Sequence, residues 1–95
     1  MRISVIIPTF NSAQTIDDTL RSIMSQQWPG LEIIVQDGGS SDHTRAIVGK
    51  YPIAMSGWQS EPDRGLYDAM NKGISRATGE IIAILNSDDV WMPDT

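Results

Sequence analysis

Arg2–Ile7, RISVII, is a β-branched apolar run that Pro8 brings to an end. Leu31–Gln36 (LEIIVQ) and Ile81–Leu85 (IIAIL) have the same character, and a weaker candidate lies around Ile53–Gln59. The three clear runs are nearly continuous in apolar residues, a pattern typical of parallel strands that are covered on both faces. They are therefore predicted to be the buried strands of a parallel sheet.

Helical patterns separate these runs. Ser12–Gln27 carries apolar residues at helical spacing, a shorter helix is expected from Ser41 or Asp42 to about Lys50, and Leu66–Thr78 has one apolar stripe. The order predicts an α/β fold, an open and mainly parallel sheet with helices on both faces and right-handed crossovers. Ligands of such sheets bind beyond the carboxyl ends of the strands. The loops expected there are Pro8–Asn11, Asp37–Asp42 and Asn86–Asp89.

Composition and charge exclude several classes of protein. The chain has 95 residues, which suits one domain. It has no cysteine, so disulfides and thiolate metal sites are excluded. Twelve acidic against seven basic residues give a net charge of −5, which argues against a nucleic-acid binder. The first strand is not followed by a GxGxxG turn, which argues against a standard dinucleotide fold, and no GxxxxGKS/T loop is present, which excludes a P-loop.

Two of the three loops carry groups suited to a nucleobase. Phe10 either offers an aromatic face to a base or caps the core, and the sequence leaves both interpretations open. Asp37 can accept a hydrogen bond from a base N–H, while Gly38 lets the backbone approach a ligand closely. The simpler interpretation of this second loop is a turn that leads into a helix cap at Ser41 or Asp42.

The third loop, Asn86-Ser87-Asp88-Asp89, places two adjacent acids after an apolar strand. Carboxylate oxygens on a strand end suit Mg²⁺ or Mn²⁺, which bind through one or two carboxylates together with substrate phosphates. The alternative is an acidic loop that caps a following helix. A diphosphate would be repelled by the acids near the strand ends unless a divalent cation reversed the local sign, with help from Arg64 and Arg45. These acids are Asp37, Asp42, Glu61, Asp63, Asp68, Asp88 and Asp89.

Five motifs, in the same order along the chain, resemble those of the family-2 glycosyltransferases with the GT-A fold. They are VIIPTFN (Val5–Asn11), VQDGGSSDHT (Val35–Thr44), SEPDRGLYDAMNKGI (Ser60–Ile74), ATGEII (Ala77–Ile82) and LNSDDVWMPD (Leu85–Asp94). The resemblance covers nearly the whole chain. It implies that residues 1–95 are the nucleotide-sugar-binding N-terminal part of a GT-A, Rossmann-like glycosyltransferase domain whose C-terminal acceptor half is absent.

The resemblance implies an activity and a set of site residues. The activity is the inverting transfer of a sugar from a nucleotide-diphosphate donor, often UDP-linked, to an acceptor hydroxyl, assisted by Mn²⁺ or Mg²⁺. Asn86 stands where the DxD-type element of the family has its first acid, and an amide can still hydrogen-bond a ribose. The residues implied in nucleotide-sugar binding are Pro8, Thr9, Phe10, Asn11, Asp37, Gly38, Arg64, Asn86 and Ser87, and the implied metal ligands are Asp88 and Asp89.

The catalytic base and the acceptor site of this family lie in the C-terminal half, so the base is expected beyond Thr95 and the fragment is expected to be inactive alone. The motifs SEPDRGLYDAMNKGI and NSDD are most similar to those of bacterial enzymes that build surface polysaccharides. The resemblance thus implies a saccharide or lipid-linked saccharide acceptor and no nucleic-acid partner. It also implies a cytoplasmic enzyme at the inner face of the membrane, associated peripherally through missing regions.

Other expectations follow from the residues themselves. An unpaired terminal strand predicts self-association of the fragment. A metal-dependent nucleotidyltransferase is the main alternative, although it needs a glycine-rich loop with a basic residue and PTFNSAQT after the first strand has neither. A non-catalytic nucleotide-binding module is a further alternative.

Overall fold

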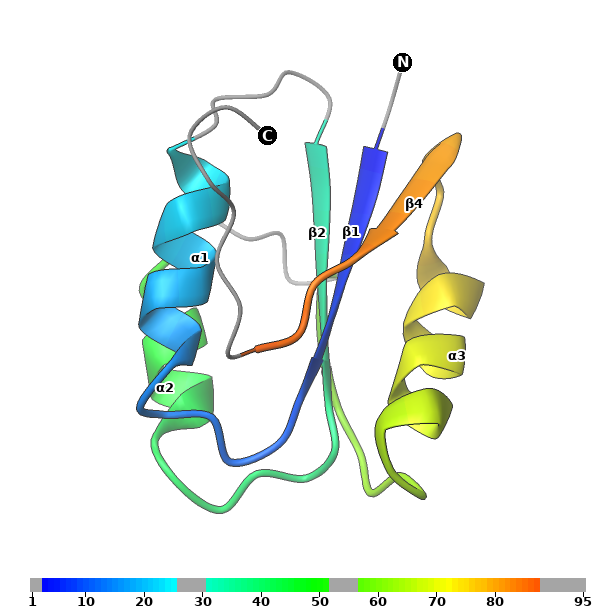
Figure 1. The fold of residues 1–95 in the computed structure, drawn as a ribbon. Coiled ribbons are helices and arrows are strands. Elements are labelled where there is room, and N and C mark those ends of the chain that lie inside the picture. The colour runs from blue at the N-terminus through cyan, green and yellow to red at the C-terminus, as the bar shows by residue number, and fades with distance from the viewer. Residues whose placement is uncertain (1–2, 26–30, 52–56, 88–95) are drawn as a thin grey trace.

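The computed structural model describes residues 3–25, 31–51 and 57–87, which form one parallel sheet with helices on both faces (Figure 1). The strand order is β3-β2-β1-β4, and every pair is parallel. The predicted fold class is therefore confirmed. The elements are β1 (Ile3–Thr9), α1 (Ile16–Met24), β2 (Leu31–Asp37), α2 (Thr44–Val48), β3 (Trp58–Ser60), α3 (Leu66–Arg76) and β4 (Ile81–Ile84).

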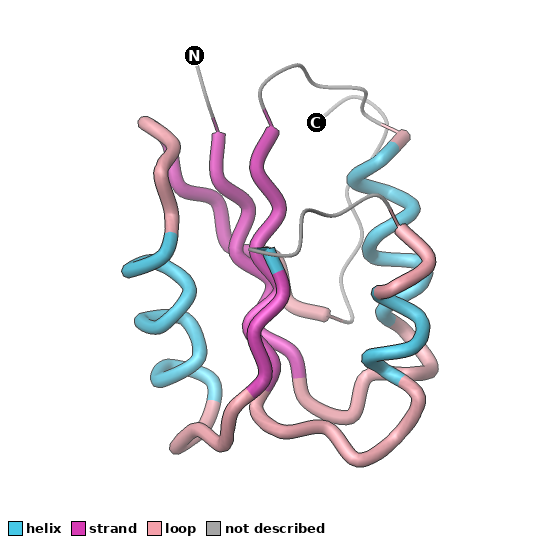
Figure 2. The backbone as a smooth tube through the Cα atoms, turned by 180° about the vertical axis from the view of Figure 1, so that it is seen from behind, coloured by secondary structure: helices cyan, strands magenta, loops and turns pink. Residues whose placement is uncertain are grey.

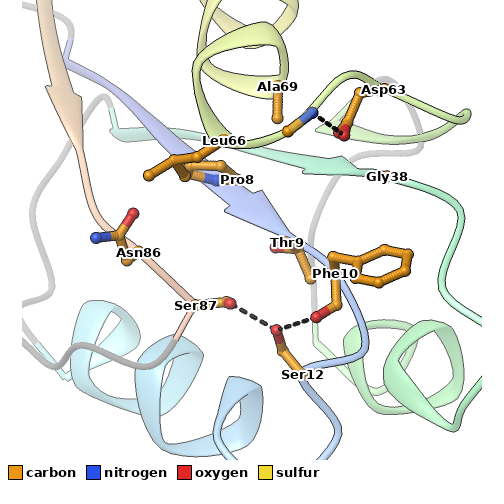
Figure 3. A pocket seen from close by; sticks show the side chains of 11 residues that line it. Pro8, Thr9, Phe10, Ser12, Gly38, Asp63, Leu66, Ala69, Asn86 and Ser87 are labelled. Carbon is orange, nitrogen blue, oxygen red and sulfur yellow. Dashed lines mark hydrogen bonds between the residues drawn. The ribbon is translucent and has the colours of Figure 1, made fainter.

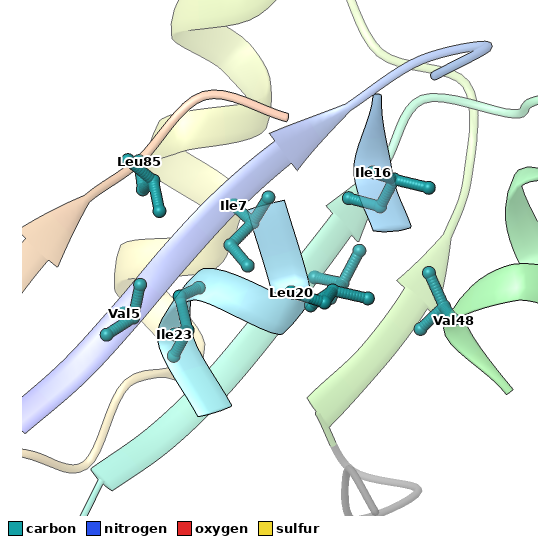
Figure 4. Packing of buried hydrophobic residues seen from close by; sticks show 8 residues of the cluster. Val5, Ile7, Ile16, Leu20, Ile23, Val48 and Leu85 are labelled. Carbon is teal, nitrogen blue, oxygen red and sulfur yellow. The ribbon is translucent and has the colours of Figure 1, made fainter. Parts of the chain in front are cut away.

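Helices α1 and α2 cover one face of the sheet, and α3 covers the other (Figure 2). Side chains of a strand alternate between the faces, so β1 sends Val5 and Ile7 towards α1 and Ile6 towards α3. This two-sided burial explains why β1 is apolar at every position from Val5 to Ile7. The buried cluster beneath α1 and α2 consists of Val5, Ile7, Ile16, Leu20, Ile23, Val35, Val48 and Leu85 (Figure 4).

Helix α3 approaches the sheet closely because Gly73 faces β1. A Cβ atom at this position would lie 2.3 Å from Cγ2 of Ile6, far inside van der Waals contact. The absence of a side chain thus sets the distance between the helix and the strand. It also sets the position of the first turn of α3, which carries part of the site described below.

Strand β1 extends through Pro8 to Thr9, so the prediction that the strand ends before Pro8 is wrong. Ile6 and Pro8 direct their backbone groups to the same side, and the Ile6 carbonyl accepts the Leu85 N–H from the β4 side. Pairing with β4 ends at the level of Ile6 and Ile84. Pro8 lacks an N–H group, but that position faces the β4 side, where the described residues form no further strand pairing. Strand β1 therefore continues through Pro8 without losing a hydrogen bond.

The exposure of β4 contradicts a second prediction, that all three clear apolar runs are strands covered on both faces. Ile81, Ile82 and Ile84 are each 43% exposed, because β4 is an edge strand and the helices pack mainly over β1 and β2. The edge position agrees with the expectation of an unpaired terminal strand, although the apolar sequence of β4 does not show how far its side chains are exposed.

The bounds of other elements differ from prediction by a few residues. Helix α1 begins at Ile16 rather than Ser12, because the Ser12 carbonyl accepts the Thr15 and Ile16 N–H groups in a turn that precedes the helix. The weak fourth strand is present as β3, and the first part of its predicted range falls in 52–56, outside the described residues. None of the helices in the described residues has the length and apolarity that crossing a membrane requires.

Candidate functional site

A pocket of about 780 Å³ opens at the carboxyl ends of the strands (Figure 3), and its size falls in the range of small-molecule sites. The structure brings together six of the predicted site residues there: Pro8, Thr9, Phe10, Gly38, Asn86 and Ser87. The other described lining residues are Ser12, Asp63, Gly65, Leu66 and Ala69.

Phe10 and Gly38 lie together at one end of the pocket. The Gly38 N–H donates to the Thr9 carbonyl over 2.8 Å, which holds the loop after β2 against the end of β1. Phe10 is 61% exposed and lines the pocket. Of the two interpretations of Phe10, the aromatic face open to a ligand therefore fits the structure, and the cap over the core does not.

Asp37 is only 1% exposed, and its carboxylate is occupied by the protein itself. Oδ2 accepts the N–H groups of Gly39 at 3.0 Å and Ser40 at 2.7 Å and the Ser60 hydroxyl at 2.7 Å, while Oδ1 accepts the Ser40 hydroxyl. Buried charges persist when they are hydrogen-bonded in this way. Asp37 thus shapes the turn after β2 and ties it to β3, and it is not among the described residues that line the pocket.

Asn11 braces the loop after β1 against the loop after β2. Its φ of 46° lies in the left-handed region, which asparagine tolerates better than most residues. The Asn11 N–H donates to the Ser40 hydroxyl at 2.7 Å, and the Asn11 side-chain oxygen accepts the Ser41 N–H at 2.9 Å. Asn11 is not among the described residues that line the pocket, and its two bonds hold the loops after β1 and β2 together.

Asp42 joins the same two loops from the other side. Its carboxylate accepts the Thr44 hydroxyl and N–H and, at 3.2 Å, the Ala13 N–H. The Thr44 hydroxyl and these backbone N–H groups lower the pKa of Asp42. The N-cap residue of α2 is His43, so the expected cap at Ser41 or Asp42 is wrong, although the Asp42 carboxylate accepts the N–H of Thr44, the first residue of the helix.

Asn86 and Ser87 lie across β1 from Gly38, at the β4 end of the pocket (Figure 3). The Ser87 hydroxyl is 2.6 Å from the Ser12 hydroxyl, and the Ser87 carbonyl accepts the Thr19 hydroxyl at 2.9 Å. The buried side-chain oxygen of Asn86 accepts no hydrogen bond from any residue that the structure describes. Buried acceptors in native proteins are nearly always paired, so an unpaired oxygen in a pocket wall is a candidate ligand contact.

The segment before α3 contributes a carboxylate that the sequence analysis did not select. The Asp63 side chain lines the pocket, and its Oδ1 accepts the Gly65 N–H at 3.0 Å. The side chain of Arg64, which was selected, is not among the described groups that line the pocket. The Arg64 N–H donates to Asp68 at 2.9 Å, and this bond lowers the pKa of Asp68.

Asp63, Gly65, Leu66 and Ala69 belong to the motif that spans Ser60–Ile74, and Asp63 was counted among the acids near the strand ends. The charge pattern was therefore the signal that could have singled out Asp63. The spacing of residues in the Ser60–Ile74 motif does not show which side chains point towards the pocket. Helix α3 contributes to the pocket only because it packs on β1 and β2.

The predicted metal ligands Asp88 and Asp89 lie outside the described residues. Within residues 3–25, 31–51 and 57–87, no group of three or more histidine, cysteine or acidic residues is arranged to hold a metal ion. The unpaired Asn86 oxygen, two residues before Asp88, is a hard neutral donor of the kind that Mg²⁺ and Mn²⁺ accept. The described part of this loop therefore fits the cation that the sequence predicts.

The parallel sheet and the pocket beyond its strand ends define an α/β protein that binds its ligand at this edge. The profile of Glycosyl transferase family 2 matches residues 4–95, so the chain belongs to this family. The resemblance drawn from the five motifs is thus confirmed.

Curated relatives carry the same family name. An uncharacterised glycosyltransferase of Mycobacterium tuberculosis is 42% identical over 88 residues, which cover 92% of this chain and 34% of the relative. TuaG of Bacillus subtilis, a glycosyltransferase named for teichuronic acid biosynthesis, is 37% identical over 95 residues, which cover 97% of this chain and 38% of TuaG. The chain therefore spans roughly a third of the length of these relatives.

Solved glycosyltransferase structures share the fold. Staphylococcus aureus TarS in complex with UDP-GlcNAc superposes with a TM-score of 0.87 at 30% identity, covering 99% of this chain and 28% of TarS. The mannosyltransferase PcManGT from Pyrobaculum calidifontis, in complex with GDP-Man and Mn²⁺, superposes with a TM-score of 0.86 at 34% identity, covering 98% and 29%. The predicted GT-A architecture is thus confirmed.

Proposed function

We propose that the protein is the donor-binding part of an inverting glycosyltransferase that transfers a sugar from a nucleotide-diphosphate donor, most simply a UDP-sugar, to an acceptor hydroxyl. The observation that carries this proposal is the pocket at the strand ends, with an unpaired Asn86 oxygen two residues before the acidic pair. The nucleotide sugars bound by TarS and PcManGT support it. TuaG supports a role in building bacterial surface polysaccharides.

The proposed donor lies across the end of β1, with its base on the β2 side and its diphosphate on the β4 side. Thr9, Phe10 and Gly38 form the first end, where an aromatic face can stack on a base. Asn86 and Ser87 form the second end, where an amide and a backbone segment can meet the ribose and lead to the diphosphate. Arg64, an exposed residue between the lining residues Asp63 and Gly65, is the proposed cationic contact for a phosphate.

Asp88 and Asp89 are the residues that would hold Mn²⁺ or Mg²⁺. When bound, the cation would supply Lewis-acid stabilisation of the charge that grows on the leaving diphosphate. The Ser12–Ser87 and Thr19–Ser87 bonds hold the described part of the loop after β4 against α1.

Inversion requires the acceptor hydroxyl to attack the anomeric carbon directly, as a carboxylate base takes its proton. In this proposal the base and the acceptor site belong to the part of the domain that residues 1–95 do not include. The acceptor would be a saccharide or lipid-linked saccharide, met at the cytoplasmic face of the membrane. The exposed isoleucines of β4 are the surface through which residues 1–95 alone would self-associate.

Calorimetric titration of UDP in the presence of Mn²⁺ tests the proposal. UDP should bind, and either EDTA or Asp88→Ala should weaken the affinity at least about tenfold, because the acids near the strand ends repel an uncompensated diphosphate. Asp18→Ala is the matched control, since it removes one exposed carboxylate from α1, away from the pocket residues. Equal affinity for UDP with and without EDTA would refute the proposed metal dependence.

A further inference from the structure

Residues 61–65 join β3 to α3 and lie tightly against the turn after β2. A Cβ atom at Gly38 would lie 2.7 Å from Oδ2 of Asp63 and 3.1 Å from its Cγ and Oδ1. The Asp63 carboxylate therefore fills the space that a side chain at position 38 would take. Since Asp63 and Gly65 both line the pocket, the position of this segment determines the shape of one pocket wall.

The ends of this segment are held by single hydrogen bonds. The Glu61 N–H donates to the Asp37 carbonyl at 3.0 Å, and Asp63 Oδ1 accepts the Gly65 N–H at 3.0 Å (Figure 3). Gly65, where the chain turns into α3, has a φ of 117°, which glycine adopts far more readily than other residues. Glycine also loses the most conformational entropy on folding, so a segment that ends at Gly65 depends on further contacts to keep one position.

Lys72 supplies such contacts from the second turn of α3. Its ammonium group donates to the Pro62 carbonyl at 3.1 Å and lies 3.5 Å from a carboxylate oxygen of Glu61. It also lies 3.4 Å from Oδ2 of Asp68, one helical turn before it. These three oxygens surround a group that has three N–H donors. The Lys72 side chain is only 29% exposed, so it is held on the protein surface rather than extended into solvent.

Asp68 extends this connection to the next residue of the segment. Its Oδ2, which faces Lys72, also accepts the Arg64 N–H at 2.9 Å. Lys72 and Asp68 are four positions apart, so they lie on the same face of α3. This face therefore contacts the segment at positions 61, 62 and 64. Neither Lys72 nor Asp68 is among the described residues that line the pocket, so their contacts lie behind the pocket wall.

We infer that Lys72 is a positioning residue for donor binding, which holds residues 61–65 in place while its own side chain stays outside the pocket. The inference rests on the proposed function. It also gives a role to the last part of the Ser60–Ile74 motif, which extends beyond the last pocket residue on α3, Ala69. A looser segment lowers the fraction of molecules that are competent to bind, and the apparent affinity falls by the same factor.

Lys72→Met removes the ammonium group and keeps most of the length of the side chain. We expect calorimetry in Mn²⁺ to show UDP binding weakened about fivefold, and trypsin to cleave after Arg64 about five times faster, because the segment has few other bonds. Urea denaturation should change little, since partly exposed ion pairs contribute little to global stability. Lys72→Arg keeps the charge and the donors and should restore both UDP binding and resistance to trypsin.

Lys50→Met is the charge-matched control. Lys50 is an exposed residue just after α2 and is not among the described residues that line the pocket. Its loss lowers the positive charge of the chain by the same amount and leaves residues 61–65 untouched. UDP binding and the rate of cleavage after Arg64 should therefore match those of the wild-type protein.

The double variant Glu61→Gln/Asp68→Asn separates positioning from a long-range effect of charge. It removes both ion pairs of Lys72, while the new amide oxygen at position 68 can still accept the Arg64 N–H. If Lys72 acted only through its charge, the loss of two nearby acids would strengthen the binding of an anionic ligand. Positioning predicts the opposite sign: UDP binding about twofold weaker and faster cleavage after Arg64.

The outcomes separate this inference from the proposed function. Weaker UDP binding and faster cleavage in Lys72→Met and in the double variant, with Lys72→Arg close to the wild type, would support the inference. Unchanged cleavage in Lys72→Met, or stronger UDP binding in the double variant, would overturn it and leave the proposed function standing. If the wild-type protein does not bind UDP with Mn²⁺, both are overturned. If circular dichroism shows that Lys72→Met does not fold, the double variant decides the question.

Discussion

The loop after β2 and the loop after β4 stand on either side of β1 and differ in how their polar groups are satisfied. In the first, the Asp37 carboxylate accepts four hydrogen bonds from its own chain. In the second, the buried Asn86 oxygen accepts none from the described residues. The loop after β2 therefore has its buried carboxylate satisfied by the protein itself, while the loop after β4 keeps a polar atom that a ligand can satisfy.

Asp37→Ala should produce the largest effect on stability. The substitution leaves two backbone N–H groups and two hydroxyls without their acceptor, so we expect the free energy of unfolding to fall by about 3 kcal/mol. Urea denaturation followed by circular dichroism measures it. Asp63→Ala loses only the bond to the Gly65 N–H, and its expected cost is about 1 kcal/mol. Similar costs for the two variants would break the contrast drawn between a structural and a ligand-facing carboxylate.

Gly73→Ala tests the close approach of α3 to β1. The added Cβ would lie 2.3 Å from Cγ2 of Ile6, so the helix must shift. We expect a loss of about 1–3 kcal/mol in urea denaturation. Gly49→Ala is the matched control: Gly49 has helical φ and ψ angles, and a Cβ there would meet its neighbours no closer than 3.5 Å. Should Gly73→Ala prove as stable as Gly49→Ala, the packing of α3 described here would be incorrect.

Asn86→Ala tests the loop after β4, where a buried polar atom is left for a ligand. Because the Asn86 oxygen has no partner among the described residues, its removal should change the free energy of unfolding by less than about 0.5 kcal/mol. UDP binding in Mn²⁺ should weaken by about 1 kcal/mol, or roughly fivefold, as one ligand hydrogen bond is lost. A large loss of stability with unchanged UDP binding would show that this oxygen serves the fold.

Lowering the pH should reduce the stability that the ionised Asp42 side chain contributes, and this is the smallest of the expected effects. The pKa of Asp42 is held below its usual value, first by the Thr44 hydroxyl, so its ionised form stabilises the folded state. This contribution is present above about pH 4, the usual pKa of aspartate, and is lost as the pH falls through the lower pKa of the folded state. Asp42→Asn should therefore lose less in Tm than the wild type between pH 5 and pH 3, by thermal denaturation. An identical pH profile would contradict this role.

The comparison also indicates how far sequence reasoning reaches. The apolar runs and helical patterns predicted the parallel sheet and the edge at which the pocket lies, because burial on both faces constrains the composition of a strand directly. The same reasoning did not place Asp63 in the pocket or remove Asp37 from it. Both are acids near strand ends, and their difference depends on donors from Ser60 and Gly65, which only the folded chain brings to them.

The sequence by itself determined the fold class, the family and the loops that form the candidate site, because these depend on hydrophobic periodicity and on motifs that are local in the chain. Only the tertiary structure showed how far the β4 side chains are exposed, that Pro8 continues a strand, and that Gly38 makes room for a carboxylate from beyond β3. Each of these depends on contacts between segments far apart in the sequence. Asp37 and Asp63, both acids near strand ends, therefore differ in their surroundings because contacts with distant segments determine their hydrogen-bond partners.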